Sequence, residues 1–211
     1  MSLLRLHQAV MAGQAAPAGN YWNPADKTSL ILLSNGNATA TRDTPSPTAF
    51  NAVRGITSHN SGKWYAECLN VVDVPGSMIF GVGTSGASLS TFPGGGTPLG
   101  SSWGVQANNN TRRATYYNGL QTNQGGTSGI SAGGLGILAV DFDAGRIWFG
   151  DSAFGFYTGN PSAGTTPTYT FTAGTTLFLM LGMASSPQQC TLRNQVGENT
   201  GTIPTGFSMW G

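Results

Sequence analysis

From Tyr21 onward, the chain alternates between short hydrophobic runs and turn-forming residues. The run SMIFGVG (Ser77 to Gly83) is almost wholly apolar, which is typical of a strand buried on both faces, and TLFLMLGMA (Thr176 to Ala184) is a further short strand-like run. GKWYAECLNVV (Gly62 to Val72) instead alternates, so we predict a long strand with one wetter face that carries Glu67. No stretch keeps the helical period of about 3.6 residues. The pattern therefore predicts an all-β sandwich or barrel.

Gly, Pro and Asn mark the boundaries between these runs. Asn35-Gly36 follows the predicted strand TSLILL (Thr28 to Leu33), and Asn118-Gly119 ends RRATYYNG. Asn-Gly between two extended runs is a strong signal for a hairpin. Two Gly-rich stretches, at residues 84–100 and 121–134, predict irregular loops. Long loops in compact domains are usually functional or mobile, so binding residues are expected there.

The stretch AVDFDAGRIWFG places two carboxylates just ahead of a glycine. If one strand ran through both, Asp141 and Asp143 would share a face and could form a catalytic pair. The stronger prediction is a hairpin with a three-residue loop from Asp143 to Gly145, with Gly145 at positive φ, Asp143 exposed and no metal bound. An EF-hand is excluded because Gly145 and Ser152 occupy ligand positions, and an irregular Ca²⁺ site with distant oxygens is the remaining alternative.

Composition adds limits on the partners. The chain has 211 residues, of which 8% are charged, and a formal net charge of +1. The length suits one domain with a sizeable core, and the low charge provides no broad field for nucleic acid, so no nucleic-acid partner is expected. No run approaches the roughly 18 to 20 apolar residues of a membrane helix, so no membrane partner is expected. Residues 1–19 lack the basic region of a signal peptide and are predicted to form an arm or a short amphipathic helix.

The inventory of reactive side chains is small. His7 and His59 lie outside any nucleophile motif such as Gly-x-Ser-x-Gly, and PGGGTPLG lacks the lysine of a P-loop. Cys68 and Cys190 are too few for a zinc site, so two buried thiols are favoured, with a single disulfide as the alternative. We therefore expect no enzymatic activity, no catalytic residue, no cofactor and no metal.

Several short motifs follow one another in an order typical of a known family. They are WNPADK (Trp22 to Lys27), LSNGNATAT (Leu33 to Thr41), VRG (Val53 to Gly55), SGKWYAE (Ser61 to Glu67), IFGVG (Ile79 to Gly83), YYNG (Tyr116 to Gly119), ILAVDFDAGRIWF (Ile137 to Phe149) and GNPSAGTTP (Gly159 to Pro167). In these motifs the chain resembles the SPRY (B30.2-like) family, especially the SPRY-like modules of bacteriophage virion proteins. The chain departs from the family pattern at Gly150-Asp151-Ser152 and at RNQVG. These departures affect the expected local geometry of loops and strands more than the expected architecture.

The resemblance implies a fold and a class of function. It implies a concanavalin-like antiparallel β-sandwich of two sheets that binds through loops at one edge. It also implies protein interaction and no catalysis, although function follows only weakly from a fold.

The predicted binding surface consists of side chains in loops that are expected to be exposed. Aromatic and Arg side chains in loops are common interface anchors. On this basis the predicted contact residues are Phe92, Asn109, Arg112, Arg113 and Tyr117. The alternative is that Tyr116 and Tyr117 straddle a strand, with one of the two rings facing inward.

Two functions of different classes follow from these observations. The first is a non-enzymatic phage virion protein, a structural, capsid-decoration or tail-associated subunit that is assembled in the host cytoplasm. In it, residues 1–19 form an arm that binds other virion subunits, residues 20–211 form one SPRY-like sandwich, and the chain is expected to be a homo-oligomer. The second is a carbohydrate- or receptor-binding adhesion module for a host-surface glycan or protein, in which Phe92 or Tyr117 stacks on a sugar. A third, a hydrolase built on Asp141, has no second catalytic partner in the sequence.

Overall fold

A computed structural model describes residues 20–42, 44, 50–72, 74, 78–96, 98–107, 113–126, 130–184, 186–193, 198 and 201–211. Every regular element in these ranges is a strand, as the hydrophobic pattern predicts. The described residues contain no helix long and apolar enough to cross a membrane. The strands are β1 (Trp22–Lys27), β2 (Leu32–Ser34), β3 (Thr39–Arg42), β4 (Asn51–His59), β5 (Lys63–Val72), β6 (Met78–Gly83), β7 (Ser102–Ala107), β8 (Ala114–Tyr117), β9 (Leu120–Asn123), β10 (Leu135–Asp141), β11 (Arg146–Asp151), β12 (Gly155–Phe156), β13 (Tyr169–Thr170), β14 (Leu177–Met183), β15 (Gln188–Leu192) and β16 (Ser208–Met209).

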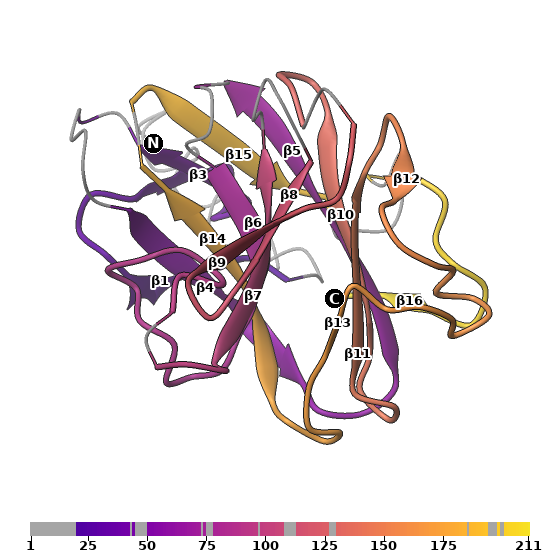
Figure 1. Ribbon diagram of the computed structural model, residues 1–211. Coiled ribbons are helices and arrows are strands. Elements are labelled where there is room, and N and C mark those ends of the chain that lie inside the picture. The colour runs from indigo at the N-terminus through magenta and orange to yellow at the C-terminus, as the bar shows by residue number, and fades with distance from the viewer. Residues whose placement is uncertain are drawn as a thin grey trace, which may run out of the picture.

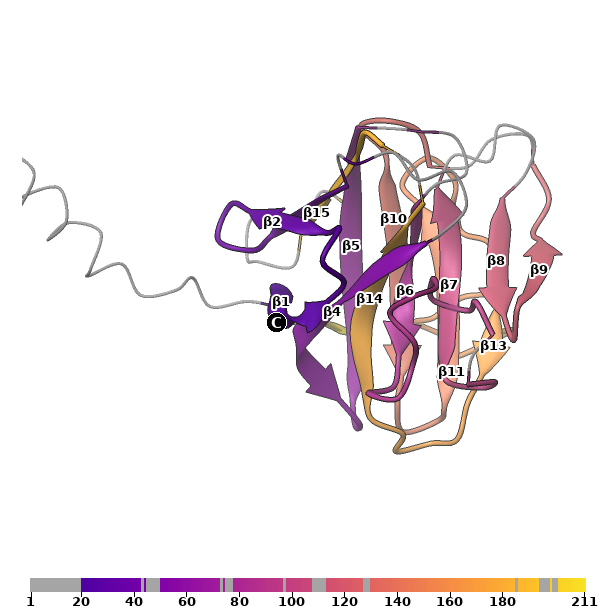
Figure 2. The ribbon, with the colours of Figure 1, turned by 90° about the vertical axis from the view of Figure 1, so that its left-hand side faces the viewer.

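One layer of the molecule is a seven-stranded antiparallel sheet. Its strand order is β1-β4-β14-β6-β7-β8-β9, and Figure 2 shows these strands side by side from β1 to β9. Every residue of β6 is buried, as its apolar run predicts. The inner face of the sheet contributes Val82, Trp103 and Leu181 to the main hydrophobic core. This core lies between the two sheets, so the fold is the antiparallel β-sandwich that the sequence predicts.

The second layer is a nine-stranded sheet with hydrophobic clusters on both of its faces. Its main order is β12-β11-β10-β5-β15-β3-β2, while β13 pairs with β11 and β16 pairs with β5. Leu138 and Phe149 point into the main core between the sheets. The residues that alternate with them point the other way, and Ile137 and Trp148 form a second cluster with Phe207. This sheet therefore needs a cover on its outer face as well as on its inner face.

The outer face of β5 is not the wetter face that the sequence predicted. Glu67 and its neighbour Tyr65 on that face are both completely buried. The reason is the C-terminal segment, residues 201–211. Its Gly201 N–H donates to Glu67 Oε1 at 2.9 Å, and its Phe207 packs in the same hydrophobic cluster as Tyr65. Strand β16 of this segment pairs in parallel with β5. Figure 1 shows this segment and β12 on the side of the sheet that faces away from the seven-stranded layer.

The Gly-rich loop after β6 covers the outer face of the seven-stranded sheet. Its described part contains no strand, as predicted, but it packs closely on β7 and β14. A Cβ added to Gly182 would lie 2.7 Å from the Phe92 Cβ, and one added to Gly104 would lie 2.5 Å from the Pro93 carbonyl oxygen. Glycine within a strand often marks such a close approach by another backbone. These two glycines therefore leave the room that lets the loop lie directly against the sheet.

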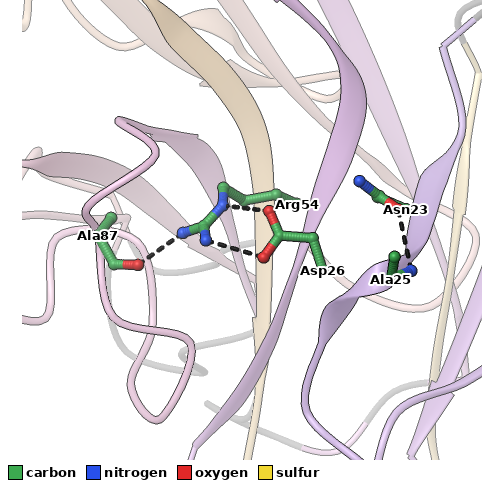
Figure 3. A network of polar contacts seen from close by, with 5 residues as sticks. All are labelled: Asn23, Ala25, Asp26, Arg54 and Ala87. Atoms are coloured by element: carbon green, nitrogen blue, oxygen red, sulfur yellow. Dashed lines mark hydrogen bonds and ion pairs between the residues drawn. The ribbon is translucent and has the colours of Figure 1, made fainter.

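Arg54 of β4 fixes the beginning of the same loop. Its guanidinium donates two hydrogen bonds to the Asp26 carboxylate, at 2.7 and 2.8 Å, and a third to the Ala87 carbonyl at 2.5 Å (Figure 3). The Arg54 side chain is only 9% exposed. Bidentate pairs between Arg and a carboxylate are among the stronger hydrogen bonds in proteins. The network ties β1, β4 and the covering loop into one unit.

The two Asn-Gly turns form as predicted. Gly36 and Gly119 have φ values of +62° and +75°, and each closes a hairpin, β2 to β3 and β8 to β9. The strand expected at residues 28–33 is shorter and later, because only Leu32–Ser34 pairs with β3. The second Gly-rich stretch was expected to be wholly irregular, but its first residues belong to the edge strand β9. Pairing with β8 overrides the low strand propensity of this polar segment.

The hairpin of β10 and β11 carries the two aspartates noted in the sequence. Gly145 has a φ of +62° and Asp143 is exposed, both as predicted. Asp141 pairs with Arg146, which leaves residues 142–145 as the loop, one residue more than predicted. The extra residue is Phe142, whose ring is completely buried in the main core. The Phe142 N–H donates to the Gly62 carbonyl at 2.9 Å.

The two cysteines lie on neighbouring strands. Cys68 of β5 and Cys190 of β15 are both buried and free, which confirms the favoured prediction of two buried thiols. Burial, followed by the neighbouring Cys190, raises the pKa of the Cys68 thiol.

His59, the last residue of β4, lies in an aromatic cluster. Its ring stacks on Trp64 with centroids 3.7 Å apart and meets the rings of Trp210 and Phe142 at 5.0 and 6.4 Å. Its Nε2 atom is buried and has no hydrogen-bond partner among the described residues. Burial lowers the pKa of His59, so the folded protein favours the neutral ring.

This cluster predicts a pH dependence of stability. As the pH falls below the ordinary histidine value of 6.5, the unfolded chain takes up a proton at residue 59 before the folded chain does. The free energy of unfolding should therefore decrease with falling pH in this range. A His59→Phe variant keeps the stacked ring and should lose that part of the decrease. Denaturant melts of both proteins between about pH 5 and about pH 8 measure the difference. Parallel curves for the two proteins would contradict the assignment.

Candidate functional site

The two aromatic residues of the predicted binding surface both pack within the domain. Phe92 is half-buried between Phe50 and Tyr116, with ring centroids 4.4 and 5.1 Å away. Tyr117 stacks on Trp103 at 5.5 Å and packs against the main core. Tyr116 and Tyr117 therefore straddle β8, and Tyr117 is the ring that faces inward. A role for Phe92 or Tyr117 in binding stays a prediction.

Arg113 is likewise engaged within the domain. Its side chain is 16% exposed, and its Nε lies 3.5 Å from the Asp151 carboxylate. The guanidinium also lies over the Phe154 ring, 3.9 Å from the ring centroid. The other two predicted contact residues, Asn109 and Arg112, lie outside the described residues. The structure does not bring Phe92, Arg113 and Tyr117 together, because they pack toward three different parts of the domain.

A pocket of about 520 Å³ lies on the outer face of the nine-stranded sheet. We call it the outer-face pocket. Tyr65 of β5 and Ile137 of β10 line it from the sheet. Three short segments supply the remaining lining residues, which are Asp151, Ser152, Gly155 and Phe156, then Gly159, Asn160, Pro161 and Ser162, and finally Gly201, Thr202 and Pro204.

The segment that contains Gly159 and Asn160 is held by a backbone bridge and by side chains of the sheet. Asn160 and Thr165 form an isolated antiparallel bridge, with both N–H groups donating at 3.1 to 3.2 Å. The buried Trp148 donates from its indole N–H to the Thr165 carbonyl at 2.9 Å. Arg146 donates to the Gly164 carbonyl at 2.6 Å. The sheet therefore fixes this wall of the pocket through side chains of β11.

The C-terminal wall of the pocket is fixed by the buried Glu67. The Glu67 Oε1 atom accepts hydrogen bonds from the Tyr65 hydroxyl at 2.8 Å and from the Gly201 N–H at 2.9 Å. Burial, and then the adjacent Glu67, raises the pKa of the Tyr65 hydroxyl, so this phenol stays protonated and acts as a donor. A buried carboxyl group is costly unless it is hydrogen-bonded, so the Gly201 N–H helps to stabilise Glu67 at this position.

Asp151 joins the pocket to Arg113. Its Oδ1 accepts hydrogen bonds from the N–H groups of Ala153 and Phe154 at 2.9 and 2.7 Å, which shapes the turn before β12. Its Oδ2 faces Arg113 in the ion pair described above. Burial, and then the Asp151 carboxylate, raises the pKa of the nearby Tyr157. The carboxylate of the pocket lining is therefore already matched by a cation.

The carboxylates of Asp141 and Asp143 also serve the fold. Asp141 forms an ion pair with Lys63 at 3.2 Å and accepts from the Ala144 N–H at 3.0 Å. Asp143 accepts from the Gly62 N–H at 2.9 Å, which joins two hairpin turns. Within the described part of the chain, no three His, Cys, Asp or Glu side chains are grouped as a metal site would require.

The sequence did not reveal this pocket. Asn160 and Ser162 belong to a motif that indicated the fold, and nothing in it indicated a cavity. Glu67 was assigned to a wetter face because a single strand carries no information about a cover from a distant segment. The available signal was the apolar C-terminal stretch GFSMW, whose Phe207 and Trp210 need a surface to pack on.

The contact between Gly201 and Glu67 makes a prediction. A Cβ at residue 201 would lie 2.5 Å from Glu67 Oε1 and 2.7 Å from the Tyr65 hydroxyl oxygen. Gly201→Ala should therefore destabilise the protein by about 1 to 3 kcal/mol, the usual cost of overpacking a buried site. Thr205→Ala, an exposed position of the same segment, is the matched control and should have little effect. Chemical denaturation measures both, and an unchanged stability for Gly201→Ala would show that the segment does not lie against Glu67.

Comparisons with known proteins bear on the fold. No protein-family model and no curated protein matches the chain. Among solved structures, the PSpry domain of TRIM65 has a TM-score of 0.62 at 18% identity and covers 92% of this chain and 100% of that one. The SPRY domain of human HERC1 has a TM-score of 0.61 at 17% identity, covering 81% of this chain and 96% of that one. Stonustoxin has a TM-score of 0.57 at 17% identity, covering 83% of this chain and 27% of that one. The chain thus has the SPRY-like β-sandwich fold.

Proposed function

We propose that the chain is a non-enzymatic interaction module, in which a SPRY-like sandwich binds other proteins. The observation that carries the proposal is the extent of the fold likeness, which includes nearly all of one SPRY domain and nearly all of a second. Because a fold can host many functions, the likeness supports the class of function and leaves the partner open.

The engagement of the charged groups supports a non-catalytic role. Asp26, Asp141 and Asp151 each form an ion pair with a basic residue of the domain. Glu67 is buried beneath the C-terminal segment. Catalytic carboxylates usually stand in a cleft with a second reactive group close by. Asp26, Asp141 and Asp143 instead connect strands and turns.

The setting that we propose for this module is a bacteriophage particle, with assembly in the host cytoplasm. The support comes from the sequence, whose motifs resemble the SPRY-like modules of virion proteins and whose residues 1–19 differ in composition from the rest. In this proposal residues 1–19 bind a neighbouring capsid or tail subunit, and residues 20–211 are displayed as a decoration or tail component. Segments that become ordered on binding are a common docking device, and closed symmetry favours a homo-oligomer.

A second candidate function is recognition of a host-surface glycan or receptor. The rings first considered for this role, Phe92 and Tyr117, already stack on other rings of the domain. The outer-face pocket is the observation that favours the second candidate.

The role of the arm can be tested by deletion. A chain that begins at residue 20 should be nearly absent from purified particles, while the full chain should be present in a fixed ratio to the other subunits. Mass spectrometry of purified particles measures this ratio. A thermal melt of the shortened chain shows whether the sandwich has kept its stability, so that misfolding is separated from loss of docking. Normal incorporation of the shortened chain would overturn the anchoring role, and absence of the full chain from particles would overturn the virion setting.

A further inference from the structure

We propose that the outer-face pocket binds a neutral saccharide. The inference deepens the second candidate function, recognition of a glycan, and rests on it, but it does not depend on the proposed role in a particle. Its basis is the combination of charge, hydrogen-bond donors, apolar surface and rigidity in the lining of one pocket.

The charges of the lining exclude most ionic ligands. Asp151 is the one charged side chain among the lining residues, and no Lys, Arg or His is among them. Its Oδ1 is occupied by two backbone N–H groups and its Oδ2 faces Arg113 at 3.5 Å. A phosphate or carboxylate ligand would find no cation in the pocket, and a cationic ligand would compete with Arg113 for the carboxylate. The ligand that fits this balance carries no net charge.

The polar side chains of the lining offer hydrogen-bond donors. The Ser152 hydroxyl oxygen accepts from the Leu135 N–H at 3.0 Å, and the Ser162 hydroxyl oxygen accepts from the Thr205 N–H at 2.9 Å. Each hydroxyl is therefore held in place through its oxygen and keeps its hydrogen for another acceptor. Asn160 accepts from the Ala163 N–H through Oδ1, which leaves its NH₂ group as a further donor. Fixed donors without charge suit the hydroxyl and ring oxygens of a sugar.

The rest of the lining is apolar or aromatic. Ile137 and Tyr65 lie at the sheet side of the pocket, where both residues are buried, and Phe156, Pro161 and Pro204 line it from the sides. The partly exposed Phe156 is therefore the aromatic ring that a ligand can reach. Phe156 is partly exposed and meets the Tyr65 ring in an edge contact at 6.5 Å. A pyranose has C–H groups on its faces and hydroxyl groups around its rim. It can therefore use the aromatic and polar groups of this pocket at the same time.

The pocket is also pre-formed. Its two loop walls are joined to each other by the hydrogen bond from the Thr205 N–H to Ser162. Each wall is separately held on the sheet, one by Trp148 through the Thr165 carbonyl and the other by Glu67 through the Gly201 N–H. Rigid walls lower the entropy lost when a ligand binds. The volume of about 520 Å³ lies within the usual range for small-ligand sites, roughly 300 to 1,000 Å³.

The test uses the full chain and a defined panel of probes. The panel contains neutral di- to tetrasaccharides of glucose, galactose, mannose and N-acetylglucosamine, sialylated and sulfated saccharides, and neutral tetrapeptides. Saturation-transfer NMR identifies binders, and calorimetric titration measures their dissociation constants. We expect one or more neutral saccharides to bind, and the sialylated, sulfated and peptide probes to bind more weakly.

Two matched variants locate the binding. Thr202 is exposed and lines the pocket, so Thr202→Trp should fill the mouth and weaken binding at least about tenfold. Ser208 is exposed in the same segment and is not a lining residue, so Ser208→Trp should bind as the wild type does. Thermal melts confirm that both variants are folded.

Three outcomes overturn the proposal. The first is that no neutral saccharide binds the folded wild type at millimolar concentration. The second is that a saccharide binds equally well to Thr202→Trp, which would place the site elsewhere on the chain. The third is that charged saccharides or peptides bind the pocket more tightly than any neutral saccharide, which would identify a different class of ligand.

Discussion

The burial of Glu67 is the constraint on which the nine-stranded sheet and its outer cover depend. A carboxyl group in the middle of a central strand cannot lie in an apolar interior without hydrogen-bond partners. Tyr65 supplies a partner from the same strand, and Gly201 supplies a partner from a segment 134 residues further along the chain. The requirement brings the C-terminal segment onto the sheet, where Phe207 and Trp210 complete two hydrophobic clusters. The same placement forms one wall of the outer-face pocket.

A similar principle operates on the opposite face of the sandwich. The seven-stranded sheet is covered by the loop after β6, which approaches so closely that Gly182 and Gly104 have no room for side chains. Arg54 fixes that loop through its carbonyl contact, while Asp26 balances the charge of the guanidinium. With so few charged residues available, each described pair joins segments that are distant in sequence. Among the described residues the ion pairs join strands, turns and loops, and the side-chain donors of the pocket lining are neutral.

The strands and turns could be predicted because their causes are local. Apolar runs defined β6 and β14, and Asn-Gly or Gly145 marked the hairpins that the structure contains. The sandwich followed from the order of these elements and from the motifs that resemble SPRY proteins. The two segments that cover the outer faces of the sheets, the C-terminal segment and the loop after β6, could not be predicted. The burial of Glu67 and the packing of Phe92 depend on contacts between segments that are remote in the sequence. For the same reason Tyr117 and Arg113, chosen for their residue type, proved to be engaged within the domain, while the pocket was missed.

The most direct test of this account is amide hydrogen exchange in the native full-length protein. The Gly201 and Trp210 amides donate to Glu67 and to the Tyr65 carbonyl, and neither lies within a strand. If the C-terminal segment is held by β5, both amides should exchange about as slowly as those of β5 and β10. Exchange of these two amides at the rate of an unstructured chain, with the sheet still protected, would contradict the account.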